Sequence, residues 1–155
     1  MNLETISDRE LKELFQKSRD SPRKRAIKTF HDDTYEGPQV CLNVIQPGSY
    51  IRPHYRYIDE AIIHYSGVLC SIQFDEHGRI KKTELIGSYK PYLFLPQKTI
   101  QSIVALRDNS AIWMVVQGPH DQQKFSEYLA SAPPENQEHS AYAHYLETIA
   151  KDLYS

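Results

Sequence analysis

The chain has 155 residues, a length that suits one domain and is too short for two full ones. Charged residues make up 25% and hydrophobic residues 40%, and no apolar run approaches the roughly 20 residues that cross a bilayer, so we expect no membrane association. A formal net charge of -2 argues against a nucleic-acid surface, and the small basic cluster Pro22-Arg23-Lys24-Arg25 is interpreted as a solvated loop. The first residues do not resemble a signal peptide, which predicts a cytoplasmic location.

The first expected element is an N-terminal helix within residues 1–20. In the stretch SDRELKELFQKS, Ser7 and Glu10 have the spacing of a capping box, in which each side chain bonds the other residue's backbone amide. Leu11, Leu14 and Phe15 then fall on one stripe of the helix. These two signals together predict an amphipathic helix that covers part of a core.

Residues 38–118 have the pattern of an antiparallel β domain. Short β-rich runs alternate with turn residues: QVCLNVIQ, EAIIHYSG, GVLCSIQF, RIKKTELIG, YLFLP, QSIVAL and AIWMVVQ. The turn residues at Asp75 to Gly78 and at Arg107 to Ser110 each predict a hairpin. Because an open sheet of about seven strands leaves exposed edges, we expect an all-β fold closed into a small antiparallel β-barrel or sandwich.

Helical patterns return in residues 119–155. Phe125, Tyr128 and Leu129 lie on one stripe, and after the Pro133-Pro134 break a last helix is predicted from about Ser140. This helix has an apolar stripe that is expected to pack on the barrel, with a dimer contact as the alternative: Tyr142, Tyr145, Leu146, Ile149 and Leu153. We therefore predict one domain, residues 1–155, with helical extensions at both ends, that forms a homodimer.

The stretch GSYIRPHYRYIDEAIIHYSG, residues 48–67, contains the polar residues that suggest chemistry. Side chains of a strand alternate between its faces, so Arg52, His54 and Arg56 point the same way if this backbone is extended. Glu60 follows after a short bend. Because a buried row of cations is costly unless the charges pair, we expect at least one arginine to contact Glu60 or an anionic ligand.

The same stretch resembles the first motif of the cupins, in which two histidines and a glutamate bind a divalent metal at the mouth of a small β-barrel. Gly48, His54, Glu60 and Gly67 keep the spacing of that motif, but Arg56 stands where a second ligand is expected. The resemblance therefore predicts a barrel with an altered site.

The second cupin motif supplies a further histidine after a Pro-x-Gly turn, and LFLPQKTIQSIV aligns with it. Lys98 replaces the glycine and Gln101 the histidine. SPRKRAIKTFH, LNVIQPGSYIRPH and GPHDQQKFSEYLASAPPEN resemble segments of the WbuC family of cupins, in that family's order. The resemblance implies a cupin barrel, also called a double-stranded β-helix or jelly roll, often found with bacterial surface-polysaccharide synthesis and labelled a metalloprotein.

Only His54 and Glu60 carry over as metal ligands from this resemblance, and Gln101 is a weak third donor. The usual cupin site needs about three imidazoles and a carboxylate. The guanidinium of Arg56 has no lone pair to donate. At an effective dielectric constant near 20, it opposes a divalent ion about 4 Å away by roughly 8 kcal/mol. We therefore expect no competent metal centre and no cofactor.

Two non-catalytic hypotheses stay open: the barrel binds a ligand, or its pocket is a relic without a ligand. In the first, the barrel binds a small anion such as a sugar phosphate, and Arg56 supplies the positive charge that a metal would otherwise bring. The expected binding residues are Arg52, His54, Arg56, Glu60 and Gln101. In the second, the arginine and glutamate form an ion pair that only stabilises the barrel, and the protein has a structural or interaction role through its C-terminal helix.

A third hypothesis is an enzyme, an isomerase or epimerase of activated sugars. In its metal-dependent version a divalent ion on His54, Glu60 and Gln101 acts as a Lewis acid. In its metal-free version His54 is the base and Tyr50 is a candidate proton carrier. The two cysteines, at positions 41 and 70, are interpreted as inert core thiols because nothing near them in sequence lowers a thiol pKa.

Overall fold

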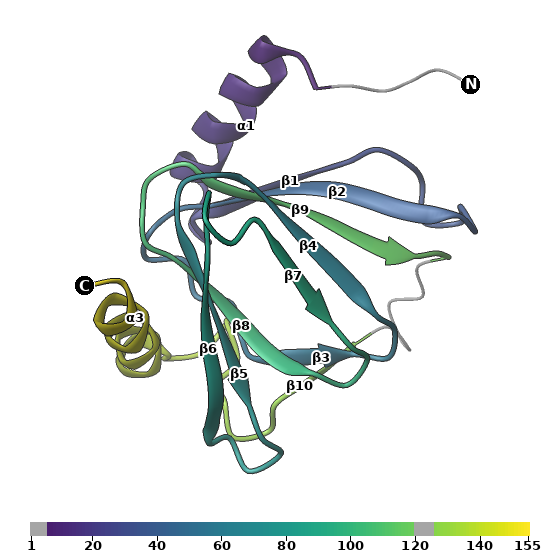
Figure 1. Ribbon diagram of the computed structural model, residues 1–155. Coiled ribbons are helices and arrows are strands. Elements are labelled where there is room, and N and C mark those ends of the chain that lie inside the picture. Colours follow the sequence, from purple (N-terminus) through teal and green to yellow (C-terminus); the bar gives the residue numbers. More distant parts are fainter. Residues whose placement is uncertain (1–5, 120–125) are drawn as a thin grey trace.

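Figure 1 shows the computed structural model of the protein, which describes residues 6–119 and 126–155. Within these residues, ten strands form two five-stranded antiparallel sheets that face each other. Only β1 with β2 and β5 with β6 are pairs of strands that are also neighbours along the chain. At most connections the chain therefore passes from one sheet to the other, which closes the two sheets into a barrel.

The first sheet has the order β1 (Arg25–Thr29), β2 (Pro38–Ile45), β9 (Ser110–Gln117), β4 (Glu60–Ser66), β7 (Tyr92–Leu95). The second sheet has the order β10 (Ser126–Tyr128), β3 (His54–Arg56), β8 (Ile100–Ala105), β5 (Leu69–Phe74), β6 (Ile80–Ile86). The seven β-rich runs of the sequence correspond to β2, β4, β5, β6, β7, β8 and β9, so the predicted all-β antiparallel fold is confirmed.

The main core lies between the sheets and consists of aliphatic side chains from both. Ile45, Ile62 and Ile112 come from the first sheet, and Leu69 and Ile103 from the second, and all are almost fully buried. Each buried side chain of this kind stabilises the fold by about 1.5–3 kcal/mol relative to an exposed one. This packed region holds the two inner faces together beside the site described below.

Gly67 forms the tight turn that links β4 in one sheet to β5 in the other. Its φ is +70°, in the left-handed region, and a Cβ atom there would lie 2.3 Å from Oγ of Ser110. A larger residue would therefore be strained and would also collide with the neighbouring strand. The crossing between the sheets at this point depends on glycine.

Helix α1 (Asp8–Asp20) packs on the outer face of β1 and β2. Its capping box is present: the amide of Glu10 donates to Oγ of Ser7 at 3.2 Å, and the amide of Ser7 donates to Oε2 of Glu10 at 2.8 Å. Leu14 is buried in a cluster with Leu42 and other residues of the first sheet. The predicted N-terminal helix and its apolar stripe are confirmed.

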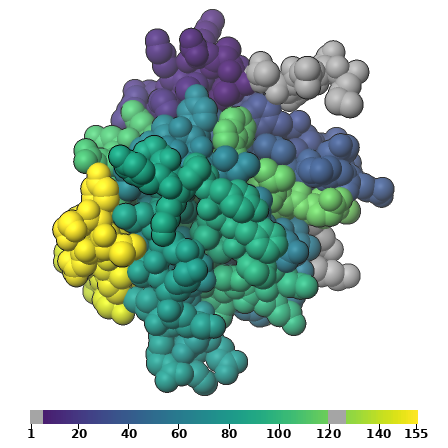
Figure 2. All heavy atoms as spheres, viewed as in Figure 1, coloured from purple at the N-terminus to yellow at the C-terminus, as the bar shows by residue number. Residues whose placement is uncertain are grey.

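Helix α3 (Ser140–Tyr154) covers the outer face of the second sheet, where it contacts β5, β6 and β8. Figure 2 shows it in yellow along one flank of the barrel. Leu146 and Ala150 are buried against this sheet, so the expected packing of the helix on the barrel is confirmed. Neither helix in the described part of the chain is long and apolar enough to span a membrane.

Three local predictions differ from the structure. Phe125 lies outside the described residues, but Tyr128 belongs to strand β10, which pairs with β3, so the predicted helical stripe is wrong there. The turn at Arg107 to Ser110 is not a hairpin, because β8 and β9 belong to different sheets. The sheets also extend beyond the predicted range 38–118, through β1 at one end and β10 at the other. The spacing of residues along the chain shows the period of an element but not which strand it pairs with. Strand pairing decided all three cases.

Candidate functional site

The residues singled out in the first motif meet at one cavity between the two sheets. Strand β3 is short, His54–Arg56, and its residue His54 is the register partner of Gln101 on β8. Side chains of register partners lie on the same face, so the two are brought side by side. Arg52, His54, Arg56 and Gln101 all line a cavity of about 220 Å³, and within β3 His54 and Arg56 share a face as strand alternation predicts.

We call this space the arginine cavity. Its wall contains four guanidinium groups and a single carboxylate among the described residues. The remaining wall is formed by polar and apolar side chains of both sheets. The full lining consists of Arg23, Arg25, Asn43, Ile45, Ile51, Arg52, His54, Arg56, Gln101, Ile103, Met114, Tyr128 and Glu135. The cavity is therefore strongly cationic.

Glu60 lies beside the arginine cavity and forms an ion pair with Nε of Arg56. The expected contact between an arginine and Glu60 is thus present. Its side chain is only 2% exposed, and burial raises the pKa of this carboxyl, an effect that the Arg56 guanidinium opposes. Oε1 of Glu60 is buried and has no hydrogen-bond partner among the described residues. The pair fixes the position of Arg56 in the cavity wall.

Sequence reasoning missed three charged residues of the cavity: Arg23, Arg25 and Glu135. Nη2 of Arg25 donates to both carboxylate oxygens of Glu135, at 2.7 and 2.9 Å, and Arg23 donates to Oε2 at 2.8 and 3.0 Å. Burial alone would raise the pKa of Glu135, but the two arginines outweigh it and lower this pKa. The basic cluster in residues 22–25, interpreted as a solvated loop, therefore supplies part of the cavity wall.

Arg52 is held at the wall by the C-terminal part of the barrel. Its guanidinium lies 4.7 Å from the ring centroid of Tyr128, on strand β10, and Nη2 donates to the carbonyl oxygen of Leu129 at 3.3 Å. A guanidinium above an aromatic face is attracted by the ring's quadrupole. Nε of Arg52 is buried and has no partner among the described residues. One donor of this arginine is therefore left unsatisfied by the described residues.

His54 is a neutral imidazole in this environment. Its Nδ1 lies 2.9 Å from the carbonyl oxygen of Arg52, and because a carbonyl only accepts, Nδ1 carries the proton. Burial and then the charge of Arg56 lower the pKa of His54 to about 4. Nε2 is therefore left as a hydrogen-bond acceptor at neutral pH. Oε1 of Gln101, a residue only 4% exposed, has no partner among the described residues.

Tyr50, the candidate proton carrier, is not among the residues that line the cavity. It is buried beneath the C-terminal segment, where its hydroxyl donates to the carbonyl oxygen of Pro133 at 2.7 Å and its ring stacks on His139. Residues 50–53 are not part of a strand, so side-chain alternation does not extend back from β3. The position of Tyr50 therefore gives no support to a role as proton carrier in this cavity.

The cupin resemblance raises the question of a divalent metal, and the side chains present do not fit one. Over residues 6–119 and 126–155, no three His, Cys, Asp or Glu side chains come together as donors. Among the residues that the structure describes, His54 is the one imidazole that lines the arginine cavity, and Glu60 is already bonded to the guanidinium of Arg56. Since a guanidinium donates no lone pair and repels a cation, the donor set is incomplete and electrostatically unfavourable.

The turn before β8 contains Lys98, at the position where the second cupin motif has a glycine. Lys98 has a φ of +63°, a left-handed conformation that glycine adopts without strain. Its amide donates to the carbonyl oxygen of Arg56 at 2.6 Å. The turn therefore holds β3 at the place where the arginine enters the cavity.

Solved structures that resemble this chain place it in the cupin fold. It matches the capsular polysaccharide assembling protein CapF of Staphylococcus aureus with a TM-score of 0.58 and 20% identity, over 66% of this chain and 29% of that one. It matches KdgF of Halomonas sp. with 0.52 and 15%, over 67% and 86%. Oxalate decarboxylase of Bacillus subtilis gives 0.51 and 17%, over 72% and 28%. The chain thus folds as a small cupin barrel and spans under a third of CapF and of the decarboxylase.

The family of the chain is also shown. Residues 6–86, more than half of the chain, match the family described as Domain of unknown function (DUF6016), and the chain belongs to that family. No curated protein matches the chain. The narrower resemblance to WbuC cupins stays a prediction.

Proposed function

We propose that this protein binds a small organic anion, such as a sugar phosphate, in the arginine cavity, and does so without a metal. The observation that supports this most is the wall of four guanidinium groups with a single carboxylate. Guanidinium groups bind phosphate and carboxylate through charge-assisted, often paired hydrogen bonds. Nε of Arg52 and Oε1 of Gln101, which have no partner among the described residues, add a donor and an acceptor for a ligand with hydroxyls.

The proposed context is bacterial surface-polysaccharide synthesis, with this protein in a binding or accessory role. Two findings support it: the resemblance of several segments to WbuC cupins, and the structural likeness to CapF, which is described as a capsular polysaccharide assembling protein. Both findings concern other proteins, so the link to polysaccharide synthesis is proposed together with anion binding. The experiment below tests anion binding.

Binding is favoured over catalysis because of the state of His54. A general base works best when its pKa lies near the working pH. Burial and Arg56 lower the pKa of His54 to about 4, so this imidazole accepts a hydrogen bond at neutral pH but is a weak base. Tyr50, the second group of the metal-free enzyme hypothesis, lies outside the cavity. The remaining polar groups suit recognition of an anion.

Calorimetric titration with inorganic phosphate and glucose 1-phosphate tests this function. We expect both to bind, more weakly as salt rises, because the attraction is electrostatic. Arg52→Gln should weaken both by about tenfold or more, since a hydrogen bond between charged groups contributes about 1.5–3 kcal/mol. Arg9→Gln removes an exposed arginine of α1 and is the matched control, with unchanged affinity. Absence of binding by either anion, or equal effects of both substitutions, would overturn the proposal.

A further inference from the structure

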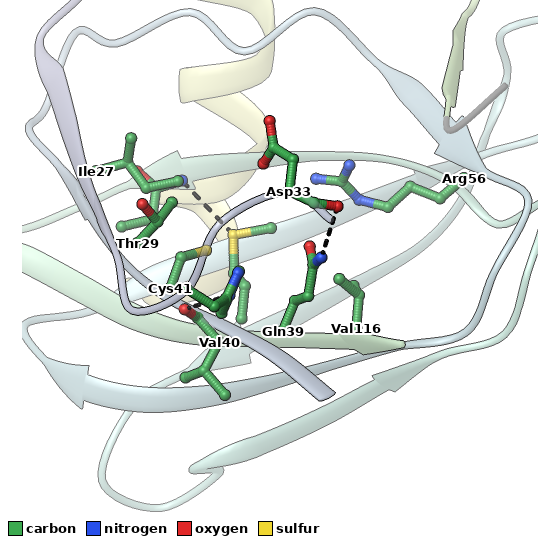
Figure 3. Close-up of a pocket in the computed structure, with 11 residues that line it drawn as sticks. Ile27, Thr29, Asp33, Gln39, Val40, Cys41, Arg56 and Val116 are labelled. Carbon is green, nitrogen blue, oxygen red and sulfur yellow. Dashed lines mark hydrogen bonds between the residues drawn. The ribbon is translucent and has the colours of Figure 1, made fainter. Parts of the chain in front are cut away.

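A second cavity of about 220 Å³ adjoins the arginine cavity, and it has a different chemical character. We call it the apolar groove (Figure 3). Its floor is the inner face of the first sheet, with side chains from β1, β2 and β9, and the segment between β1 and β2 forms its rim with His31 and Asp33. The side chains of the floor include Ile27, Thr29, Cys41, Met114 and Val116.

The strand register shows that the two cavities follow one another along the same face. Arg25 pairs with Ile45 and both line the arginine cavity. Two residues further along β1, Ile27 pairs with Asn43, and Asn43 lines both cavities. The next inward pair, Thr29 with Cys41, lines the groove alone. Since each such step covers about 6.6 Å, the groove begins one step from the arginines and continues away from them.

Arg56 lies at the junction of the two cavities. It lines both, as do Asn43 and Met114. Figure 3 shows it reaching in from the side opposite Ile27 and Thr29. Its ion pair with Glu60 holds it in this place. A ligand bonded by Arg56 in the arginine cavity therefore lies next to the groove.

The floor of the groove is apolar and partly exposed to water. Ile27 is 51% exposed although it points to the inner side of the barrel, where a covered aliphatic side chain is the usual arrangement. Burial raises the pKa of the Cys41 thiol to about 11, so this thiol stays uncharged and behaves as a small apolar group. Covering this floor with an apolar body releases bound water and favours association.

The sizes of the two cavities indicate that a single ligand uses both. Each has about 220 Å³, less than the roughly 300–1,000 Å³ typical of pockets for small organic ligands, while the two together fall within that range. We propose that the ligand is an elongated anion whose phosphate or carboxylate lies in the arginine cavity and whose aliphatic or aromatic body extends past Arg56 onto the apolar groove. This inference rests on the proposed function and narrows the ligand class from any small anion to one with an apolar body.

The test compares ligands with the same anionic group and different bodies, on the full chain. We expect phenyl phosphate to bind about tenfold tighter than inorganic phosphate, because burying a ring on an apolar floor adds this much affinity or more. Glucose 1-phosphate, whose body is polar, should gain less than phenyl phosphate. The pair hexanoate and acetate repeats the comparison for a carboxylate, and a gain in either series supports the inference. The ratio within a series should not change with salt, since salt screens only the charged part.

Two variants test whether the gain in affinity from the apolar body arises in the groove. Thr29→Trp fills the groove and should remove the advantage of phenyl phosphate while inorganic phosphate binds as before. Ile27→Asn makes the exposed floor polar and should reduce the same advantage, without a large side chain. Thr148→Trp, the same substitution as the first on the exposed face of α3, is the control and should change neither affinity.

The outcomes separate this inference from the proposed function. If phosphate binds but the apolar body adds nothing in either series, or both groove variants keep the full advantage, the inference is overturned and the anion site stands. If no anion binds, both proposals fail.

Discussion

The ion pair between Arg56 and Glu60 can be tested by removing one partner. Replacing Arg56 with methionine leaves the carboxyl of Glu60, 2% exposed, without its cation. At a contact distance of about 3 Å and an effective dielectric constant near 20, the lost attraction is about 5 kcal/mol. Measured losses for one partner of a buried pair are about 3–5 kcal/mol, so we expect Arg56→Met to lower the free energy of unfolding by that amount at neutral pH.

The loss should depend on pH, and the sign follows from Glu60. Burial raises the pKa of this carboxyl above its ordinary 4.5, and the arginine that opposed the rise is absent in the variant. A carboxyl whose pKa is raised in the folded state costs stability in full above that pKa, and this cost disappears as pH falls to its unfolded pKa. The deficit of Arg56→Met should therefore shrink as pH falls from about 7 to about 5.

Urea unfolding at the two pH values, with a double-mutant cycle, is the assay. Arg56→Met/Glu60→Gln removes both charges, and we expect it to recover most of the stability that Arg56→Met loses, because a neutral pair leaves no buried charge. A loss below about 1 kcal/mol at neutral pH, or a loss that is the same at both pH values, would refute the reasoning that Glu60 is a buried, ionised partner.

Three further predictions concern the turn and the charges of the cavity. Lys98→Gly should raise the free energy of unfolding in urea by up to about 1 kcal/mol, because glycine relieves the left-handed φ of +63°; a loss would contradict this. Affinity for sulfate, which does not titrate near neutrality, should stay constant from about pH 8 to about pH 6, since the pKa of His54 is lowered to about 4; a rise in affinity toward pH 6 would show that this imidazole is protonated there. Glu135→Gln removes the carboxylate of the cavity and should tighten phosphate binding about fivefold at low salt by calorimetry, and weaker binding would refute its role as the competing anion.

The long strands were predictable from the sequence and the short ones were not. Runs such as EAIIHYSG alternate over several residues between turn signals, and each became a strand. β1 lies in a basic segment, and β10 has three residues, Ser126–Tyr128, too few for a period to be visible. The spacing of Tyr128 and Leu129 fits a helix equally well. Pairing with β3 decided the structure, and pairing is a property of the folded chain.

The centre of the site was predictable because it lies on a strand and its register partner. His54 and Arg56 follow from alternation within β3, and Gln101 from the alignment with a second motif, while Arg52 lies just before the strand. Arg25 and Glu135 are 110 residues apart, and nothing in either segment indicates the other. The basic cluster was the one visible signal, and a net charge near zero made a solvated loop the simpler interpretation. Contacts that close the cavity from distant segments need the fold to be known.

The order of the strands sets the smallest piece of the chain that can exist by itself. The segment shared with the family ends at residue 86, but β9 lies between β2 and β4, and β8 lies between β3 and β5. A fragment cut where the likeness ends would lose the central strand of each sheet, β9 and β8, and with it the pairing of the strands on either side. The segment that matches the family, residues 6–86, is thus shorter than the folding unit. A truncated chain that keeps the central strands of both sheets must extend at least through Gln117.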